Sequence, residues 1–261
     1  MQGVKLILIL CVVALARMDA QSLARRVAAS DGIVQVIYPS RATACGDGEQ
    51  VISGVLGSGP SVYTTGNATY SANERWPRRP CVHGPARLLA TVVGGEVTRL
   101  RAFVGPVPDA RPDTRSIDAT AEDATGWLAN IVARSTSRSA SDAILPLVIA
   151  EGSNPWPLLV RVARDENRPG NVRRAAIEWL SRGVTDHLGL DDAEDRTDDD
   201  QMRSQAVFVL SQRPKSESVP DLIDLARSAI HASVRRSAIF WLGQTGDSRA
   251  IDVYAELLGL R

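Results

Sequence analysis

The sequence lacks an excess of charge of either sign. Its 261 residues include 30 Lys and Arg and 30 Asp and Glu, so the formal net charge at pH 7 is zero. A surplus of basic residues is the usual mark of a chain that binds nucleic acid or an anionic membrane. Bulk charge is therefore excluded as the force that attracts a partner, and we expect no nucleic-acid partner.

The sequence also lacks the short motifs that carry well-known chemistry. It contains no Gly-x-Ser-x-Gly, no His-Glu-x-x-His and no phosphate-binding glycine loop. Its histidines, His83, His187 and His231, form no metal-ligand motif, and no Cys-x-x-Cys is present. We expect a protein without catalytic residues or a cofactor, and therefore not an enzyme.

Long apolar runs are few, and the clearest extends from Leu6 to Ala16 behind the positive charge of Lys5. A membrane-spanning helix needs about 20 apolar residues, so this shorter run predicts a signal peptide in residues 1–20, cleaved after Ala16 or Ala20. An uncleaved membrane anchor is the alternative; a lipoprotein is disfavoured because Leu10, not a small residue, precedes Cys11. We expect an exported bacterial protein, periplasmic or extracellular, with no stable membrane insertion after cleavage.

Cysteine is scarce, and removal of the signal peptide leaves only Cys45 and Cys81. An even pair in an exported chain is most simply a disulfide. By the chain-entropy argument, closing a loop of about 35 residues contributes about 3–4 kcal/mol to stability. A redox-active or metal-binding pair is the alternative interpretation.

The first half of the chain is rich in β-branched residues and glycine. Alternating patterns from about residue 30 to 105 predict a small, disulfide-linked antiparallel β domain. Its clearest unit is a hairpin with strands at 86–93 and 96–104, since Gly94-Gly95 suits a turn with positive φ. Residues 106–118, which follow Gly105 and contain Pro106, Pro108 and Pro112, read as a linker.

The second half contains an internal repeat. Three segments align without gaps and begin 30 and 32 residues apart (202−172 and 234−202): 172–181, 202–211 and 234–243. Their apolar residues form one helical stripe with further apolar positions outside it, which predicts helices sandwiched between neighbours. Shorter partner helices are expected at 157–164, 220–227 and 249–258. The fold class is therefore α+β, with an α-solenoid over residues 119–261.

The repeated strings resemble HEAT repeats, particularly those of the bacterial HEAT-like group. They include Val-Arg-Arg-x-Ala-Ile-x-Trp-Leu and Ala-Val-Phe-Val-Leu-Ser-Gln, and the resemblance covers about Trp156 to Leu258. It implies a non-enzymatic scaffold whose armadillo-like helical surface binds a protein partner. The order of signal, β domain and repeats also resembles uncharacterised secreted bacterial HEAT-repeat proteins. Some HEAT-like proteins are bilin lyases, so the alternative is a lyase-like protein or one that binds a pigment or another small molecule.

Arg173, Arg203 and Arg235 occupy the same place in the three aligned helices. The resemblance implies a structural role, in which each arginine pairs with an acid or carbonyl and holds the stack together. The functional alternative is a ladder that binds a polyanion or an acidic partner segment.

The segment from Asp186 to Asp200 departs from the repeat, and eight of its fifteen residues are acidic. Calcium takes six to eight oxygen ligands, which makes a set of these acids weak candidates for a calcium site: Asp191, Asp192, Glu194 and Asp195. The simpler interpretation is a solvated loop, with Asp199 and Asp200 favourably placed at a helix N-terminus.

Overall fold

A computed structural model describes residues 23–49, 51–53, 55–56, 63–64, 81–108, 114–190 and 197–260. The chain divides into two compact units, one of residues 1–55 and 61–154 and the other of residues 56–60 and 155–261. The signal peptide predicted at 1–20 lies outside the described residues. Within those residues, no helix has the length and apolar character needed to cross a membrane.

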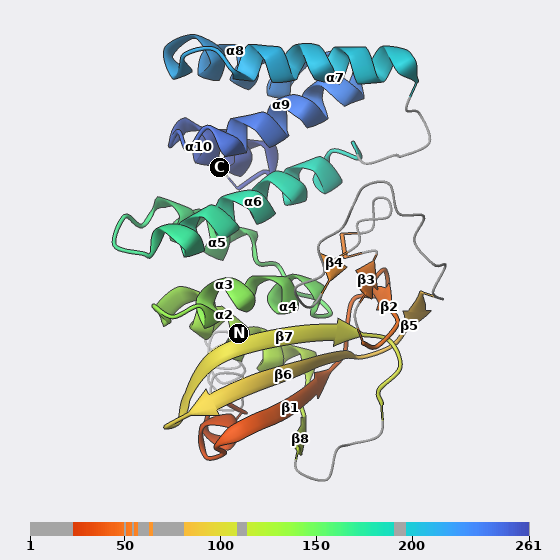
Figure 1. Cartoon of the computed structure of the whole chain (residues 1–261), viewed down its shortest axis with the longest axis vertical. Helices are drawn as coiled ribbons and strands as arrows, with labels where there is room; N and C mark the ends of the chain where they lie inside the picture. Colours follow the sequence, from red (N-terminus) through yellow and green to blue (C-terminus); the bar gives the residue numbers. More distant parts are fainter. Residues whose placement is uncertain are drawn as a thin grey trace, which may run out of the picture. The chain divides into compact units, whose positions relative to one another are not determined.

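The larger sheet of the first unit has the strand order β7-β6-β1-β8 (Figure 1). Its strands are β1 (Gly32–Tyr38), β6 (Ala86–Val93), β7 (Glu96–Val104) and β8 (Arg115–Asp118). The predicted β6–β7 hairpin is present, and Gly94 and Gly95 turn it with φ of 57° and 80°. Within the predicted residues 30–105 the strand pairs of this sheet are antiparallel, as expected, whereas β8 lies in the segment predicted as a linker and pairs with β1 in parallel. This strand lies at the end of the predicted linker and forms an edge of the sheet.

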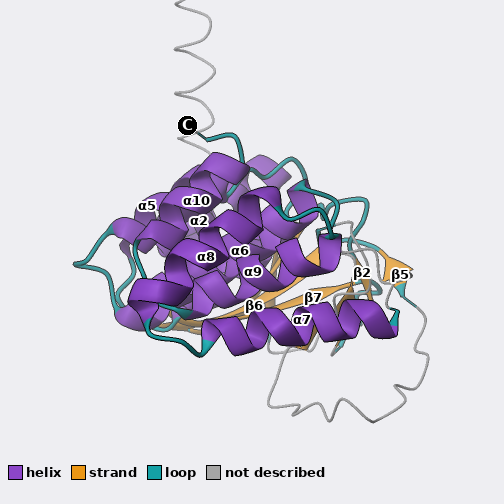
Figure 2. Cartoon of the chain, turned by 90° about the horizontal axis from the view of Figure 1, so that it is seen from above, coloured by secondary structure: helices purple, strands orange, loops and turns teal. Residues whose placement is uncertain are grey.

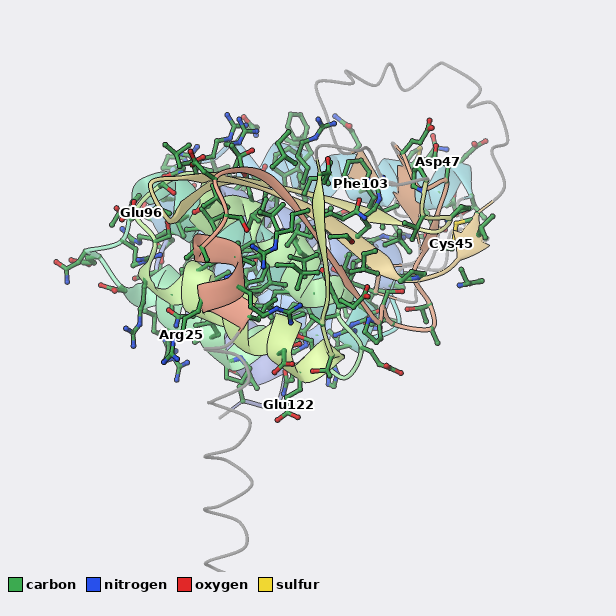
Figure 3. All side chains as sticks on the ribbon, turned by 90° about the horizontal axis from the view of Figure 1, so that it is seen from below. Arg25, Cys45, Asp47, Glu96, Phe103 and Glu122 are labelled. Atoms are coloured by element: carbon green, nitrogen blue, oxygen red, sulfur yellow. A yellow bond between two sulfur atoms is a disulfide. The ribbon has the colours of Figure 1, made fainter. Side chains whose placement is uncertain are left out.

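The second sheet is antiparallel, with strand order β4-β3-β2-β5. Its short strands are β2 (Cys45–Gly46), β3 (Val51–Ser53), β4 (Tyr63–Thr64) and β5 (Val82–His83). A disulfide joins Cys45 to Cys81 with a Cα–Cα distance of 5.1 Å, as the sequence predicts; its sulfur is visible beside the Cys45 label in Figure 3. This bond ties the start of β2 to the residue before β5.

Helices α2 (Ala121–Arg134), α3 (Ser139–Asp142) and α4 (Ile144–Ile149) belong to the same unit as the sheets. Helix α3 contacts β7, and α4 contacts β6. The hydroxyl of buried Tyr38 donates to the carbonyl of Pro146 at 3.0 Å, and burial raises the pKa of Tyr38. The array predicted from the sequence begins at residue 119 and so includes these helices, whereas the second compact unit resumes at Pro155.

The second unit contains six helices among the residues that the structure describes. They are α5 (Trp156–Arg164), α6 (Gly170–His187), α7 (Asp198–Ser211), α8 (Lys215–Ser228), α9 (Ala232–Gln244) and α10 (Arg249–Leu257). Their contacts define two rows, α6-α9-α7 and α5-α10-α8 (Figure 1). Ion pairs join α10 to both of its neighbours in the second row, Arg164–Asp252 at 2.6 Å and Arg227–Glu256 at 2.7 Å.

The order of these rows differs from the order of the chain. A stack built in chain order would place α7 between α6 and α9, but here α9 contacts both α6 and α7. The hairpin α9–α10 therefore lies between α5–α6 and α7–α8. Helix α7 consequently ends its row, and in Figure 2 it lies along the edge of the helical unit.

The three aligned helices bury their repeated stripe to different extents. Helix α6 buries all its stripe residues, which are Val172, Ala176, Trp179 and Leu180. Helix α9 buries three apolar residues in its second half: Ala238, Ile239 and Leu242. In α7 only Val207 of residues 198–211 is buried, while Met202 is 70% and Val209 59% exposed. The prediction of a sandwiched helix is wrong for α7 because this helix ends its row.

Candidate binding groove

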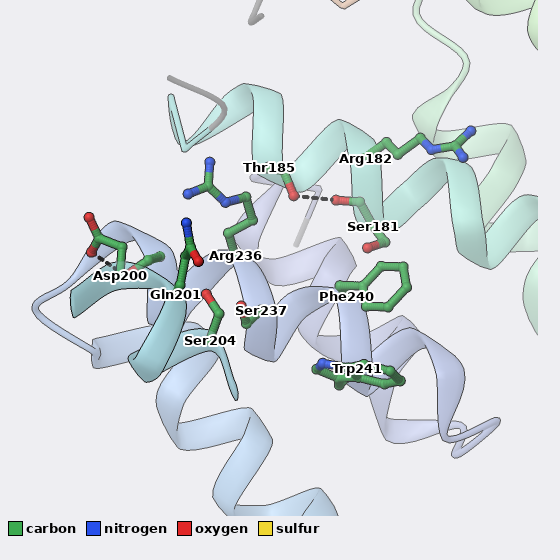
Figure 4. A pocket seen from close by; sticks show the side chains of 11 residues that line it. Ser181, Arg182, Thr185, Asp200, Gln201, Ser204, Arg236, Ser237, Phe240 and Trp241 are labelled. Carbon is green, nitrogen blue, oxygen red and sulfur yellow. Dashed lines mark hydrogen bonds between the residues drawn. The ribbon is translucent and has the colours of Figure 1, made fainter. Parts of the chain in front are cut away.

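The second unit contains a groove of about 460 Å³ between α6 and α7, with α9 as its floor (Figure 4). We call it the α9 groove. Helix α6 contributes Ser181, Arg182 and Thr185; α7 contributes Asp200, Gln201 and Ser204; α9 contributes Ser233, Arg236, Ser237, Phe240 and Trp241. The groove exists because α6 and α7 flank α9 on opposite sides of the same row.

The floor residues lie on one face of α9. Their spacing from Ser233 through Arg236 and Ser237 to Phe240 and Trp241 follows the helical repeat. At 1.5 Å per residue, the stretch from residue 233 to residue 241 rises about 12 Å along the helix axis. The α9 side chains that line the groove are therefore polar and charged at one end and aromatic at the other.

Asp200 lies at the charged end, and its carboxylate is engaged by the fold itself. Oδ1 accepts from the Ser233 hydroxyl at 2.8 Å and from Arg203 at 3.3 Å. Oδ2 accepts from the Thr197 hydroxyl at 3.0 Å, within a capping box that begins α7. The Ser233 hydrogen bond is the main reason that the pKa of Asp200 lies below its ordinary value, followed by the bond from Thr197. Asp200 thus anchors the start of α7 to the start of α9.

The two arginines of the groove differ in their partners. The guanidinium of Arg182 pairs with Glu178 at 2.6 Å and lies over the Trp179 ring, 5.0 Å from its centroid. Arg236 donates from Nη1 to the carbonyl of Leu190 at 2.5 Å. Among the described residues, no carboxylate lies within ion-pair distance of Arg236. Its positive charge is the one that the groove leaves without an acidic partner in the described part of the chain.

The aromatic end of the groove combines two half-buried aromatic side chains with an exposed ring. Trp241 packs against Phe208 of α7 and against Phe240, with ring centroids 5.0 Å apart in both pairs. Phe240 meets Trp241 edge to face and remains 49% exposed. Figure 4 shows its ring in the space between α9 and α6. An apolar surface is therefore available to a ligand about one helical turn from Arg236.

The three arginines of the predicted ladder have different partners. Arg173 donates from Nε to the carbonyl of Ala163 at 3.2 Å, whereas Arg203 pairs with Asp199 at 3.5 Å and Asp200 at 3.3 Å. The Nε of Arg235 is buried and has no hydrogen-bond partner among the described residues. None of the three lines the α9 groove, although Arg203 reaches Asp200 at its margin.

The calcium candidates Asp191, Asp192, Glu194 and Asp195 lie outside the described residues. Within the described ranges, no group of three or more His, Cys, Asp or Glu side chains could hold a metal ion. Arg236 and Phe240 are not predicted as a binding pair from the sequence. The available signal was that Phe240 falls off the buried stripe and that Arg236 lies one turn before it.

A second pocket, of about 450 Å³, lies in the first unit. Its lining includes Glu96, Trp127, Asn130 and Arg134. Three hydroxyls at its margin, of Ser135, Ser137 and Ser139, are mutually hydrogen-bonded at 2.8–2.9 Å. Its size falls within the range of small-molecule sites.

Comparison with known proteins identifies the helical repeat. Residues 234–257 match the family model of the PBS lyase HEAT-like repeat, and they cover most of α9 and α10. No curated protein and no solved structure gives a significant match. Each HEAT repeat is built on a packed pair of helices, and α9–α10 is the hairpin that contacts both others in the unit. With this match, the chain contains a HEAT-like repeat, formed by most of α9 and α10.

Proposed function

We propose that this protein is an exported, non-enzymatic scaffold that binds a protein partner through a HEAT-like α-solenoid. The observation that carries the proposal is the α9 groove, where Arg236 and the exposed ring of Phe240 share one face of the family-matched repeat. Exposed aromatic side chains and arginines are enriched at protein interfaces. The Cys45–Cys81 disulfide supports export, because such bonds persist in oxidising compartments.

A pull-down from the native envelope fraction tests partner binding. The full chain is compared with Arg236→Glu and with Arg161→Glu, which changes an exposed arginine on α5 outside the groove. We expect a protein retained by the wild type and by Arg161→Glu to be lost with Arg236→Glu. Retention of the same proteins by all three chains would overturn the groove as the binding surface.

Mass spectrometry of the protein from its native source tests export. We expect a mature N-terminus after Ala16 or Ala20 and, without reductant, a linked Cys45–Cys81 peptide. An intact N-terminus together with free thiols at both positions would contradict export.

A small-molecule ligand is the second candidate function, and the pocket of the first unit favours it by its size and its indole-containing lining. Co-purified absorbance or a ligand identified by native mass spectrometry would support this function. We expect Trp127→Ala to release such a ligand; retention of the ligand by a folded Trp127→Ala chain would place it elsewhere.

A further inference from the structure

We propose that the α9 groove accepts a short extended peptide segment with a carboxylate side chain and, two residues away in either direction, a large apolar side chain. The inference rests on the proposed scaffold function and specifies the chemistry of the partner. Three features of the groove support it: charge, apolar surface and spacing.

The charge of the groove favours a carboxylate. Arg182 is already paired with Glu178, and Asp200 is held by Ser233, Thr197 and Arg203. Arg236 uses Nη1 for a backbone carbonyl, and no carboxylate within the described residues neutralises it. A guanidinium has five N–H donors and pairs well with planar carboxylates. Among the described lining residues, Arg236 is the one cation without an acidic partner, and together with the nearby Asp200 carboxylate it favours a singly charged ligand over a phosphate dianion.

The apolar subsite is built by α9 and α7 together. Phe240 exposes about half of its surface, and its ring stands on Trp241, which in turn packs on Phe208. Because Trp241 and Phe208 hold the base of the site, an apolar side chain can cover the Phe240 ring without rearranging the core. Covering an exposed aromatic ring gives favourable burial at an interface.

The spacing along α9 sets the spacing within the peptide. Arg236 and Phe240 are four residues apart, so they are separated by about 6 Å along the helix axis. Alternate side chains of an extended peptide project from the same side at intervals of about 6.6–6.8 Å. A carboxylate and an apolar side chain at positions i and i+2 therefore match the two subsites.

The remaining lining suits an extended backbone, whose N–H and C=O groups must be satisfied when they leave water. Hydroxyl and amide side chains supply both donors and acceptors, and they come from two of the helices: Gln201 and Ser204 from α7, and Ser237 from α9. A helical peptide would satisfy its own backbone and have no use for this lining.

An NMR titration tests the proposal with the full mature chain, labelled with ¹⁵N. The probes are Ac-Gly-Glu-Ala-Leu-Gly-NH₂ and its reverse, Ac-Gly-Leu-Ala-Glu-Gly-NH₂, added up to about 5 mM so that weak binding is visible. The indole N–H signal of Trp241 is followed after its assignment with Trp241→Phe. We expect a saturable shift with at least one probe, and binding about tenfold weaker when Gln replaces Glu in that probe.

Variants of the chain locate the two subsites. Arg236→Gln should weaken binding of the Glu probe about tenfold but leave binding of the Gln probe unchanged. Phe240→Ser should weaken both, whereas the matched control Arg161→Gln should weaken neither. The proposal is overturned if neither probe shifts the Trp241 signal, or if the Glu and Gln probes bind equally well.

The two levels of the proposal fail in different ways. If the pull-down depends on Arg236 but the peptides do not bind, the scaffold function stands and the peptide chemistry is wrong. If the peptides bind as expected but no envelope protein depends on Arg236, the groove chemistry stands and the scaffold function is wrong.

Discussion

Helices α7 and α9 have nearly the same ten-residue pattern but different environments. Helix α9 contacts α6, α7, α8 and α10, and its Leu242 is fully buried. Helix α7 ends its row, and it exposes Met202 and Val209 at the positions that the pattern reserves for the core. Position in the stack, rather than local sequence, therefore decides whether the repeated stripe becomes core or surface.

The largest expected difference comes from the equivalent leucines. Leu242→Ala should lower the free energy of unfolding by about 2–5 kcal/mol, because it leaves a cavity in a buried site. Leu210 is half-buried, so Leu210→Ala should cost about 1 kcal/mol. Urea unfolding followed by circular dichroism measures both, and equal losses would break the comparison.

Gly243 of α9 aligns with Ser211 of α7, and replacing this glycine tests how closely α10 approaches α9. A Cβ at Gly243 would lie 2.8 Å from the Tyr254 hydroxyl, which donates to the Ile239 carbonyl at 2.5 Å. Gly243→Ser, which introduces the residue of α7, should therefore cost about 1–3 kcal/mol of stability. Ser211→Ala in α7 is the matched control and should be almost neutral; a neutral Gly243→Ser would contradict the close approach.

Lowering the pH should loosen the connection between α7 and α9. The pKa of Asp200 is depressed in the folded state, chiefly by the Ser233 hydroxyl, so its ionised form is the one that the fold stabilises. This contribution is complete above the ordinary pKa of 3.8 and is lost as the pH falls through the lower folded value.

Unfolding midpoints measured between pH 7 and pH 2.5 check this expectation. Asp200→Asn should remove part of the acid dependence, whereas the exposed neighbour Asp199→Asn should preserve more of it. An identical pH profile for the wild type and Asp200→Asn would contradict the role of this carboxylate.

The smallest effect is expected at the outer face of α7. Met202→Ser and Val209→Ser should change the free energy of unfolding by less than about 0.5 kcal/mol, because both side chains are already in solvent. A loss above 2 kcal/mol in a chemical unfolding curve would show that another part of the molecule covers this face.

The sequence predicts individual strands and helices better than it predicts which of them pack against one another. Gly94-Gly95 identified a hairpin because few residues other than glycine turn with positive φ, and the helical periods identified α6, α7 and α9. The pattern does not predict which of α7 and α9 packs against α6, because the two helices have similar apolar stripes. Strand β8 is four residues long and carries one buried apolar residue, Ile117, so it gave no signal of its own.

The α9 groove could not be predicted either, because it depends on which helices pack against α9. Arg236 and Phe240 lie on the side of α9 that the core stripe does not use, and only the placement of α6 and α7 makes that side concave. Pro220 illustrates the limit of local rules: it suggested a helix start, yet α8 begins five residues earlier, at Lys215 (220−215).

The position of the last hairpin has a consequence for how the helical unit is made. Contacts in an ordinary repeat array join neighbours in the chain, and folding can spread from one repeat to the next. Here the contacts between α5 and α10 can form only after α10 has been synthesised, and their ion pair joins residues 88 positions apart. Contacts between residues that are far apart in the chain slow folding. A ribosome that stops before α9 therefore releases two helical hairpins without the one that joins them.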